Sequence, residues 1–186
     1  MKAKLIALIA LVMFLIAIVW ATATEEKAKK ETKFKYVGVT ACKACHSNAK
    51  VGGEEYLKYD KDPHKNAYKT LLNEKSKKIA KEKGIDDPTK SEKCMKCHVT
   101  AWNKKDLQGE KFSYEEGVTC EACHGPGEKY KAMPIMKDHK KALENGLVVP
   151  TEKLCKTCHN QESPTYKPFD FAAKWKLIKH GKAKTK

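Results

Sequence analysis

All eight cysteines of this 186-residue chain fall in one repeated pattern, two cysteines separated by two residues and followed at once by histidine. The four units are Cys42-Lys-Ala-Cys45-His46, Cys94-Met-Lys-Cys97-His98, Cys120-Glu-Ala-Cys123-His124 and Cys155-Lys-Thr-Cys158-His159. On a helical turn, residues i and i+3 share a face, so two sulfurs can reach the two vinyl groups of one porphyrin while the next imidazole faces its iron. The pattern therefore predicts four covalently bound haem c groups, each with one protein ligand to its iron.

Pairs of cysteines at this spacing have other uses, which stay open as alternatives. They bind zinc, form redox disulfides and staple small exported domains. None of these roles requires histidine directly after the second cysteine, and here it follows all four pairs. Haem attachment is therefore the favoured interpretation.

Four haems would change how such a chain builds a core. The sequence has only 8% aromatic residues and a mean hydropathy of −0.65, so it is poor in the side chains that usually fill an interior. We expect a mostly α, small multihaem cytochrome c fold with haems forming much of the core and little β structure. Because haem binding would supply folding free energy, the apoprotein is expected to be poorly folded.

The N-terminus has the layout of an export signal. Residues 1–23 combine a basic start, an unbroken apolar run and Ala21-Thr22-Ala23, the small-residue pattern at which a signal peptidase cleaves. The alternative is an uncleaved membrane anchor. The predicted organisation is a signal peptide or anchor at 1–23, a polar tether at 24–35 and a tetrahaem cytochrome c domain at 36–186, which predicts a periplasmic location.

The net charge of +15 comes from lysine alone, since the chain contains no arginine. Without the planar guanidinium fork, specific nucleic-acid recognition is disfavoured, and no nucleic-acid partner is expected. A lysine-rich surface can steer a protein to an acidic redox partner or to an anionic membrane surface. The alternative is that the lysines only keep a haem-rich protein soluble.

Three helices are predicted between and after the motifs. Asp62 and Pro63 can start one, and Gly84 can end it after Lys83. Its residues at helical spacing are His64, Ala67, Tyr68, Leu71, Leu72, Ile79 and Ala80. The other two predicted helices are 137–145, with His139, Ala142 and Leu143 on one face, and 170–179, with Ala173 and Leu177 aligned with His180. Residues 99–119 lack a helical period and are expected to form a loop or a small hairpin.

Only three histidines lie outside the motifs: His64, His139 and His180. A single histidine on an apolar face is more often a core or surface residue than a ligand. Here four irons would each present a vacant axial position, which favours all three as distal ligands. Three histidines cannot serve four irons, so one iron is expected to lack a histidine on its far side; the rival ligands are a lysine or a methionine, Met133 or Met136.

Five segments together resemble the cytochrome c-554 family. They are YVGVTACKACH at 36–46, HKNAYKTL at 64–71, CMKCHVTAW at 94–102, EGVTCEACHGPGEKY at 116–130 and CKTCHN at 155–160. The resemblance implies a periplasmic tetrahaem electron acceptor, associated in that family with hydroxylamine oxidation, and a mostly helical fold around haems in close stacked or perpendicular pairs.

The resemblance also implies a set of iron ligands. His46, His98, His124 and His159 would be the proximal ligands of the first to fourth haems. His139 would be the distal ligand of the first haem, His64 of the third and His180 of the fourth. The second haem, on His98, would have no distal ligand from the protein.

Two functions remain after this reasoning. The first is an exported electron carrier that relays electrons through closely packed haems between redox partners, for example a multihaem oxidoreductase donor or a membrane quinol module. The alternative is a reductase of a small nitrogen oxide, such as nitric oxide, at a five-coordinate haem. Every cysteine is already assigned, so any catalysis is expected at iron.

Overall fold

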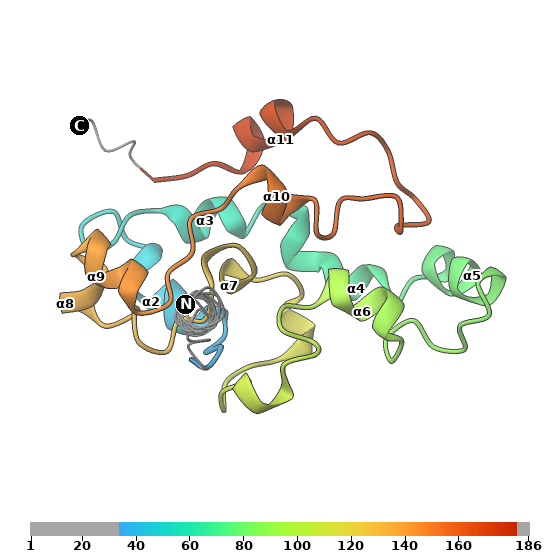
Figure 1. Cartoon of the computed structure of the whole chain (residues 1–186), viewed down its shortest axis with the longest axis horizontal. Coiled ribbons are helices and arrows are strands. Elements are labelled where there is room, and N and C mark those ends of the chain that lie inside the picture. The colour runs from blue at the N-terminus through green and yellow to red at the C-terminus, as the bar shows by residue number, and fades with distance from the viewer. Residues whose placement is uncertain (1–33, 182–186) are drawn as a thin grey trace, which may run out of the picture. The chain divides into compact units, whose positions relative to one another are not determined.

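The computed structural model describes residues 34–181, and the predictions for the signal peptide and for most of the tether lie outside the described residues. The described chain is a series of short helices (Figure 1). They are α2 (Val39–His46), α3 (Glu55–Tyr59), η1 (Pro63–Asn66), α4 (Ala67–Thr70), α5 (Glu74–Glu82), α6 (Glu92–His98), η2 (Lys105–Leu107), η3 (Tyr114–Glu116), α7 (Cys120–His124), α8 (Met133–Met136), α9 (His139–Glu144), α10 (Glu152–Cys155) and α11 (Phe171–Ile178). The expected mostly α fold is confirmed, because β pairing in residues 34–181 is limited to two isolated bridges, Tyr36 with Gln108 and Asn48 with Gly53.

Short polar side chains mark where many of these helices begin. At each such boundary a side-chain oxygen accepts a backbone N–H of the first turn, which would otherwise have no partner. The capping residues are Asp62 (η1), Asn73 (α5), Ser113 (η3), Asp138 (α9), Thr151 (α10) and Asp170 (α11). The predicted start at Asp62 and Pro63 is confirmed, and so is the stop at Gly84, whose φ of 65° is left-handed.

The single long helix expected after Pro63 is wrong, because the chain breaks at Leu71–Asn73 into η1 with α4 and a separate α5. Asn73 caps α5 by accepting the backbone N–H of Ser76 at 2.8 Å. The break turns Leu71 inward, 4% exposed, and leaves Leu72 exposed at 51%. Leu72 is therefore not part of the buried face that the sequence predicted.

The other two predicted helices exist but are shorter, and their apolar faces are not covered as expected. In α9 only Ala142 is buried, whereas His139 and Leu143 are exposed. In α11 Leu177 is 67% exposed. Residues 99–119 form a loop with two 3-10 turns, η2 and η3, so of the two alternatives the loop is correct.

The packed core lies where α4, α6 and the loop before α7 meet (Figure 1). Leu71, Met95 and Val99 are its buried centre, and partly buried side chains, among them Tyr68, Trp102, Phe112 and Tyr114, pack around it. In residues 34–181 only eight hydrophobic side chains are buried. A protein interior of this chain length ordinarily holds many more, so protein side chains alone make a small core.

A buried carboxylate joins two distant segments of the chain. Glu121, 2% exposed, accepts the backbone N–H groups of Val37, Gly38 and Gly127 at 2.7 to 3.0 Å. Glu116 accepts the next N–H along, that of Val39, at 3.1 Å. Burial raises the pKa of the Glu116 carboxyl. The two carboxylates hold the start of α2 against the loops on either side of α7.

Candidate haem-binding and electron-transfer site

Each motif sits at the end of a helical turn. In α2, α6 and α7 the last helical residue is the motif histidine itself: His46, His98 and His124. The fourth motif begins at the end of α10, and the N–H of His159 bonds to the carbonyl of Cys155 at 3.0 Å, which continues the turn. The helical turn that the spacing predicted is therefore present at all four motifs.

The eight cysteines show neither of the alternative uses. All eight thiols are free and partly buried. Within the described residues no group of three or more His, Cys, Asp or Glu side chains is arranged to hold a metal ion. The structure thus gives no support to a disulfide framework or to a cysteine-rich zinc cluster.

The motifs meet in two pairs that are not neighbours in sequence. The Cys120 thiol of the third motif raises the pKa of the Cys42 thiol of the first motif well above its usual range. The Cys158 thiol of the fourth motif does the same to the pKa of the Cys97 thiol of the second motif. Helices α2 and α7 also pack together. Lys96 of the second motif forms an ion pair with Glu162, just after the fourth.

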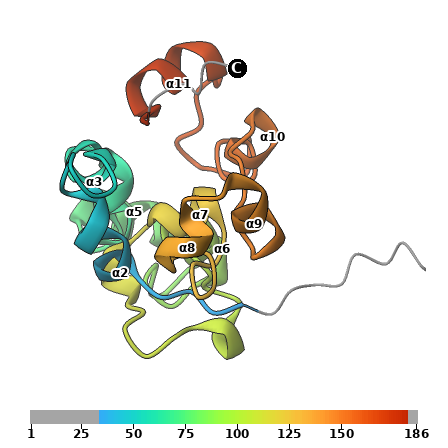
Figure 2. The same cartoon turned by 90° about the vertical axis from the view of Figure 1, so that its left-hand side faces the viewer.

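Two of the three spare histidines face a motif histidine. The rings of His64 and His159 are 5.8 Å apart, centre to centre, and those of His124 and His180 are 5.7 Å apart. The chain between α10 and α11 runs as a long loop that turns back on itself (Figures 1 and 2). His180, which follows α11, reaches His124. Each pair therefore joins remote parts of the sequence.

In these contacts His64 and His180 have exchanged the motif histidines that the family resemblance implies for them. His64 was expected with the third motif and His180 with the fourth, but the structure places His64 beside His159 and His180 beside His124. Such cross-chain partners depend on how the loops return, which the local pattern around each histidine does not contain.

His139 is not brought to a motif histidine. It begins α9, and its side chain is exposed. Met133 and Met136, the rival ligands, lie on the neighbouring helix α8. The distal roles of these residues remain predictions.

Five of the seven histidines have their Nδ1 atom engaged, which leaves Nε2 as the free ring nitrogen. The acceptors are Glu55 Oε2 for His46, Asp62 Oδ1 for His64, the Ala67 carbonyl for His98, the Val148 carbonyl for His124 and the Ile178 carbonyl for His180. Metal-bound histidines typically donate their second N–H in this way, which fixes the tautomer and the ring orientation. The arrangement suits five imidazoles that bind iron through Nε2.

The surroundings of two motif histidines favour the neutral ring. Burial lowers the pKa of His124, and His180 beside it lowers that pKa further. Burial also lowers the pKa of His159, as does the neighbouring His64. Neutral imidazole is the form that binds a metal, so both environments suit a ligand.

Sequence reasoning missed three residues that shape these sites. Glu55 and Asp62 hold histidines through Nδ1, and Phe169 stacks on the His159 ring at 4.7 Å. The Asp-Pro-His sequence could have revealed Asp62, because a short acidic side chain two residues before a histidine can reach its ring. Glu55 and Phe169 have no comparable local signal.

Residues 41–125 match the family model described as "Cytochrome c554 and c-prime". This segment resembles the cytochrome c554 family. The match indicates a c-type cytochrome with covalently bound haem c that carries electrons. No curated protein and no solved structure matches the chain.

The cytochrome c554 match covers the first three motifs and His64 but not the fourth motif, His139 or His180. The family is typically periplasmic. In residues 34–181 no helix is long and apolar enough to span a membrane.

Proposed function

We propose that this chain is a periplasmic tetrahaem electron carrier of the cytochrome c554 family. The observation that carries the count of four is the contact between the fourth motif and the family segment. His159 lies beside His64, and Lys96 of the second motif pairs with Glu162 just after the fourth, so the fourth motif is built into the same structure as the second. A cysteine pair without a role in haem binding would have no reason to lie beside a histidine from a distant helix.

The residues present fit haem c at each motif. The two cysteines and the histidine share a helical turn, Nε2 is the free nitrogen at His46, His98 and His124, and the protein's own buried core is small. Porphyrin faces would add apolar surface where side chains supply little. The haem iron supplies a reversible one-electron change, and the protein supplies its ligands and their orientation.

The proposed ligand pairs of the third and fourth haems follow the ring contacts, and those of the first and second follow the family resemblance. His159 and His64 serve the fourth haem, and His124 and His180 serve the third. His46 and His139 serve the first haem, and His98 serves the second without a histidine opposite it. The packing of α2 on α7 and the ion pair between Lys96 and Glu162 favour haem pairs in which the first lies near the third and the second near the fourth. Such pairs would shorten the path for electrons.

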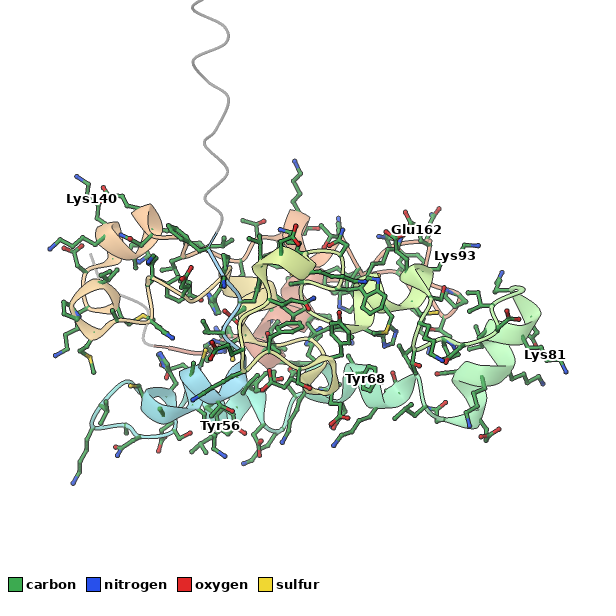
Figure 3. All side chains as sticks on the ribbon, turned by 90° about the horizontal axis from the view of Figure 1, so that it is seen from below. Tyr56, Tyr68, Lys81, Lys93, Lys140 and Glu162 are labelled. Atoms are coloured by element: carbon green, nitrogen blue, oxygen red, sulfur yellow. The ribbon has the colours of Figure 1, made fainter. Side chains whose placement is uncertain are left out.

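The surface supports a role in reversible docking. The labelled Lys81, Lys93 and Lys140 extend from the outside of the ribbon (Figure 3), and all three are exposed. Exposed ammonium groups steer association with acidic partners and make it sensitive to salt. A multihaem oxidoreductase or a membrane quinol module is the proposed partner, and contact with an anionic membrane surface is the alternative.

The first prediction concerns haem number. After expression with a haem-attachment system, intact mass and the ratio of haem to protein are expected to give four haems per chain. The control is Cys155→Ala combined with Cys158→Ala, which is expected to leave three. Fewer than four haems, or zinc, in the unmodified protein would overturn the proposal.

The second prediction concerns the iron on His98, and it separates the carrier from the reductase alternative. No other histidine ring faces His98 in the described part of the chain, which is the observation in favour of an open iron. The reduced protein is expected to bind carbon monoxide or nitric oxide at one haem in four, with a matching high-spin signal. A fully low-spin protein that takes up neither gas would exclude both the open iron and the reductase.

A further inference from the structure

The histidine acceptors fall into two chemical classes. His46 Nδ1 bonds to the carboxylate of Glu55 at 3.0 Å, with the two side chains 28% and 23% exposed. His98 and His124 instead donate to neutral backbone carbonyls, of Ala67 at 2.7 Å and of Val148 at 3.3 Å. Of the three family-segment motifs, only the first has a charged group behind its histidine.

The chain is built so that this carboxylate reaches the ring. After α2 ends at His46, the carbonyl of Asn48 accepts the N–H groups of Val51, Gly52 and Gly53, which closes a tight turn. Glu55 then begins α3, which packs against α2. The turn brings the start of α3 back to the end of α2.

Gly53 is required for the same approach. Its φ of 116° is left-handed, and a Cβ at this position would collide with the carboxylate of Glu55. Glycine therefore provides the space in which Glu55 lies beside His46. The contact depends on a specific backbone turn as well as on a flexible surface side chain.

A carboxylate at Nδ1 makes an imidazole a more basic ligand than a carbonyl does. A more electron-rich ligand stabilises ferric over ferrous iron, so it lowers the reduction potential. We propose that Glu55 is a positioning residue that makes the first haem easier to oxidise than the third, whose motif helix α7 packs against α2. This inference rests on the proposed tetrahaem function, and specifically on His46 as an iron ligand.

The test is a spectroelectrochemical titration of the holoprotein carrying Glu55→Gln, which keeps the shape and one acceptor oxygen but removes the charge. One of the four reduction potentials is expected to rise, with an increase of about tenfold in the equilibrium constant for reduction, or about 59 mV for one electron. The low-spin spectrum is expected to persist, because a neutral acceptor still orients the ring.

The matched control is Glu54→Gln, which removes a negative charge at the residue before Glu55. The Glu54 side chain is exposed and makes no hydrogen bond within the described residues. Its potentials are expected to match those of the unmodified protein. Unchanged potentials in Glu55→Gln, or equal shifts in both variants, would overturn the inference. Haem stoichiometry is measured on the same samples, so a ratio other than four per chain would count against the proposed function and not against the role of Glu55.

Discussion

Replacing Glu121 with alanine is expected to lower the free energy of unfolding of the holoprotein by about 3 kcal/mol or more. Three buried or partly buried backbone donors, Val37, Gly38 and Gly127, would lose their acceptor. Each unsatisfied buried donor costs about 1–3 kcal/mol, and water entering the vacated space would recover part of that cost. The change is measured as the shift in the denaturant midpoint at unchanged slope.

Glu128 provides the matched control for this substitution. Its carboxylate also accepts a backbone N–H from the start of the domain, that of Lys35 at 3.0 Å, but the bond is exposed to solvent. Glu128→Ala is expected to cost less than about 1 kcal/mol, because water can replace the lost acceptor. Equal losses of unfolding free energy in the two variants would show that the burial of Glu121 adds nothing to its effect on stability.

The local nature of the effect can also be tested. Amide exchange is expected to accelerate at residues 37, 38 and 127 in Glu121→Ala, more than in helices that do not contact this carboxylate. A uniform acceleration of amide exchange across the chain would indicate general loss of structure. It would contradict a local role of the hydrogen bonds to Glu121.

His64→Ala is expected to open the fourth haem and to double the uptake of carbon monoxide, from one haem to two per chain. The His64 ring lies beside that of His159, and the Asp62 carboxylate holds its Nδ1 at 2.7 Å. Removing the imidazole would leave this iron with a single histidine, which gives a high-spin signal. Lys65→Ala, at the next residue, is the control and is expected to leave uptake at one haem.

A second background decides which haem His64 serves. In the variant that lacks Cys155 and Cys158, and so the fourth haem, adding His64→Ala is expected to cause no further uptake of carbon monoxide. If uptake rises there, His64 serves another haem, as the family resemblance implied for the third. Unchanged uptake in the unmodified background would show that His64 is not a ligand.

The sequence predicts those features that depend on neighbours along the chain. The cysteine and histidine spacing predicts a helical turn at each motif, and Asp62, Pro63 and Gly84 behave as a cap, a first-turn residue and a stop. The break at Asn73 has a local signal of the same kind, because this asparagine caps the backbone N–H of Ser76. Helical periodicity continues across Asn73 and therefore does not reveal the break.

Features that depend on the return of distant segments could not be predicted in this way. The periodicity of Leu72 and Leu177 indicates a buried face, yet both are exposed. The Lys96–Glu162 ion pair and the two histidine pairs join segments that are far apart in sequence, and no local pattern predicts that these segments meet. Glu55 reaches His46 only because the turn through Gly53 reverses the chain.

The two histidine pairs also bear on how the chain folds. In each pair the two partners are far apart in sequence, since His64 precedes His159 and His124 precedes His180. Contacts between such remote positions form slowly, because a long loop must close before they are gained. His180 follows α11, so its contact with His124 forms only after the chain from α9 to α11 has folded back. Until that happens, the His124 ring lacks its partner.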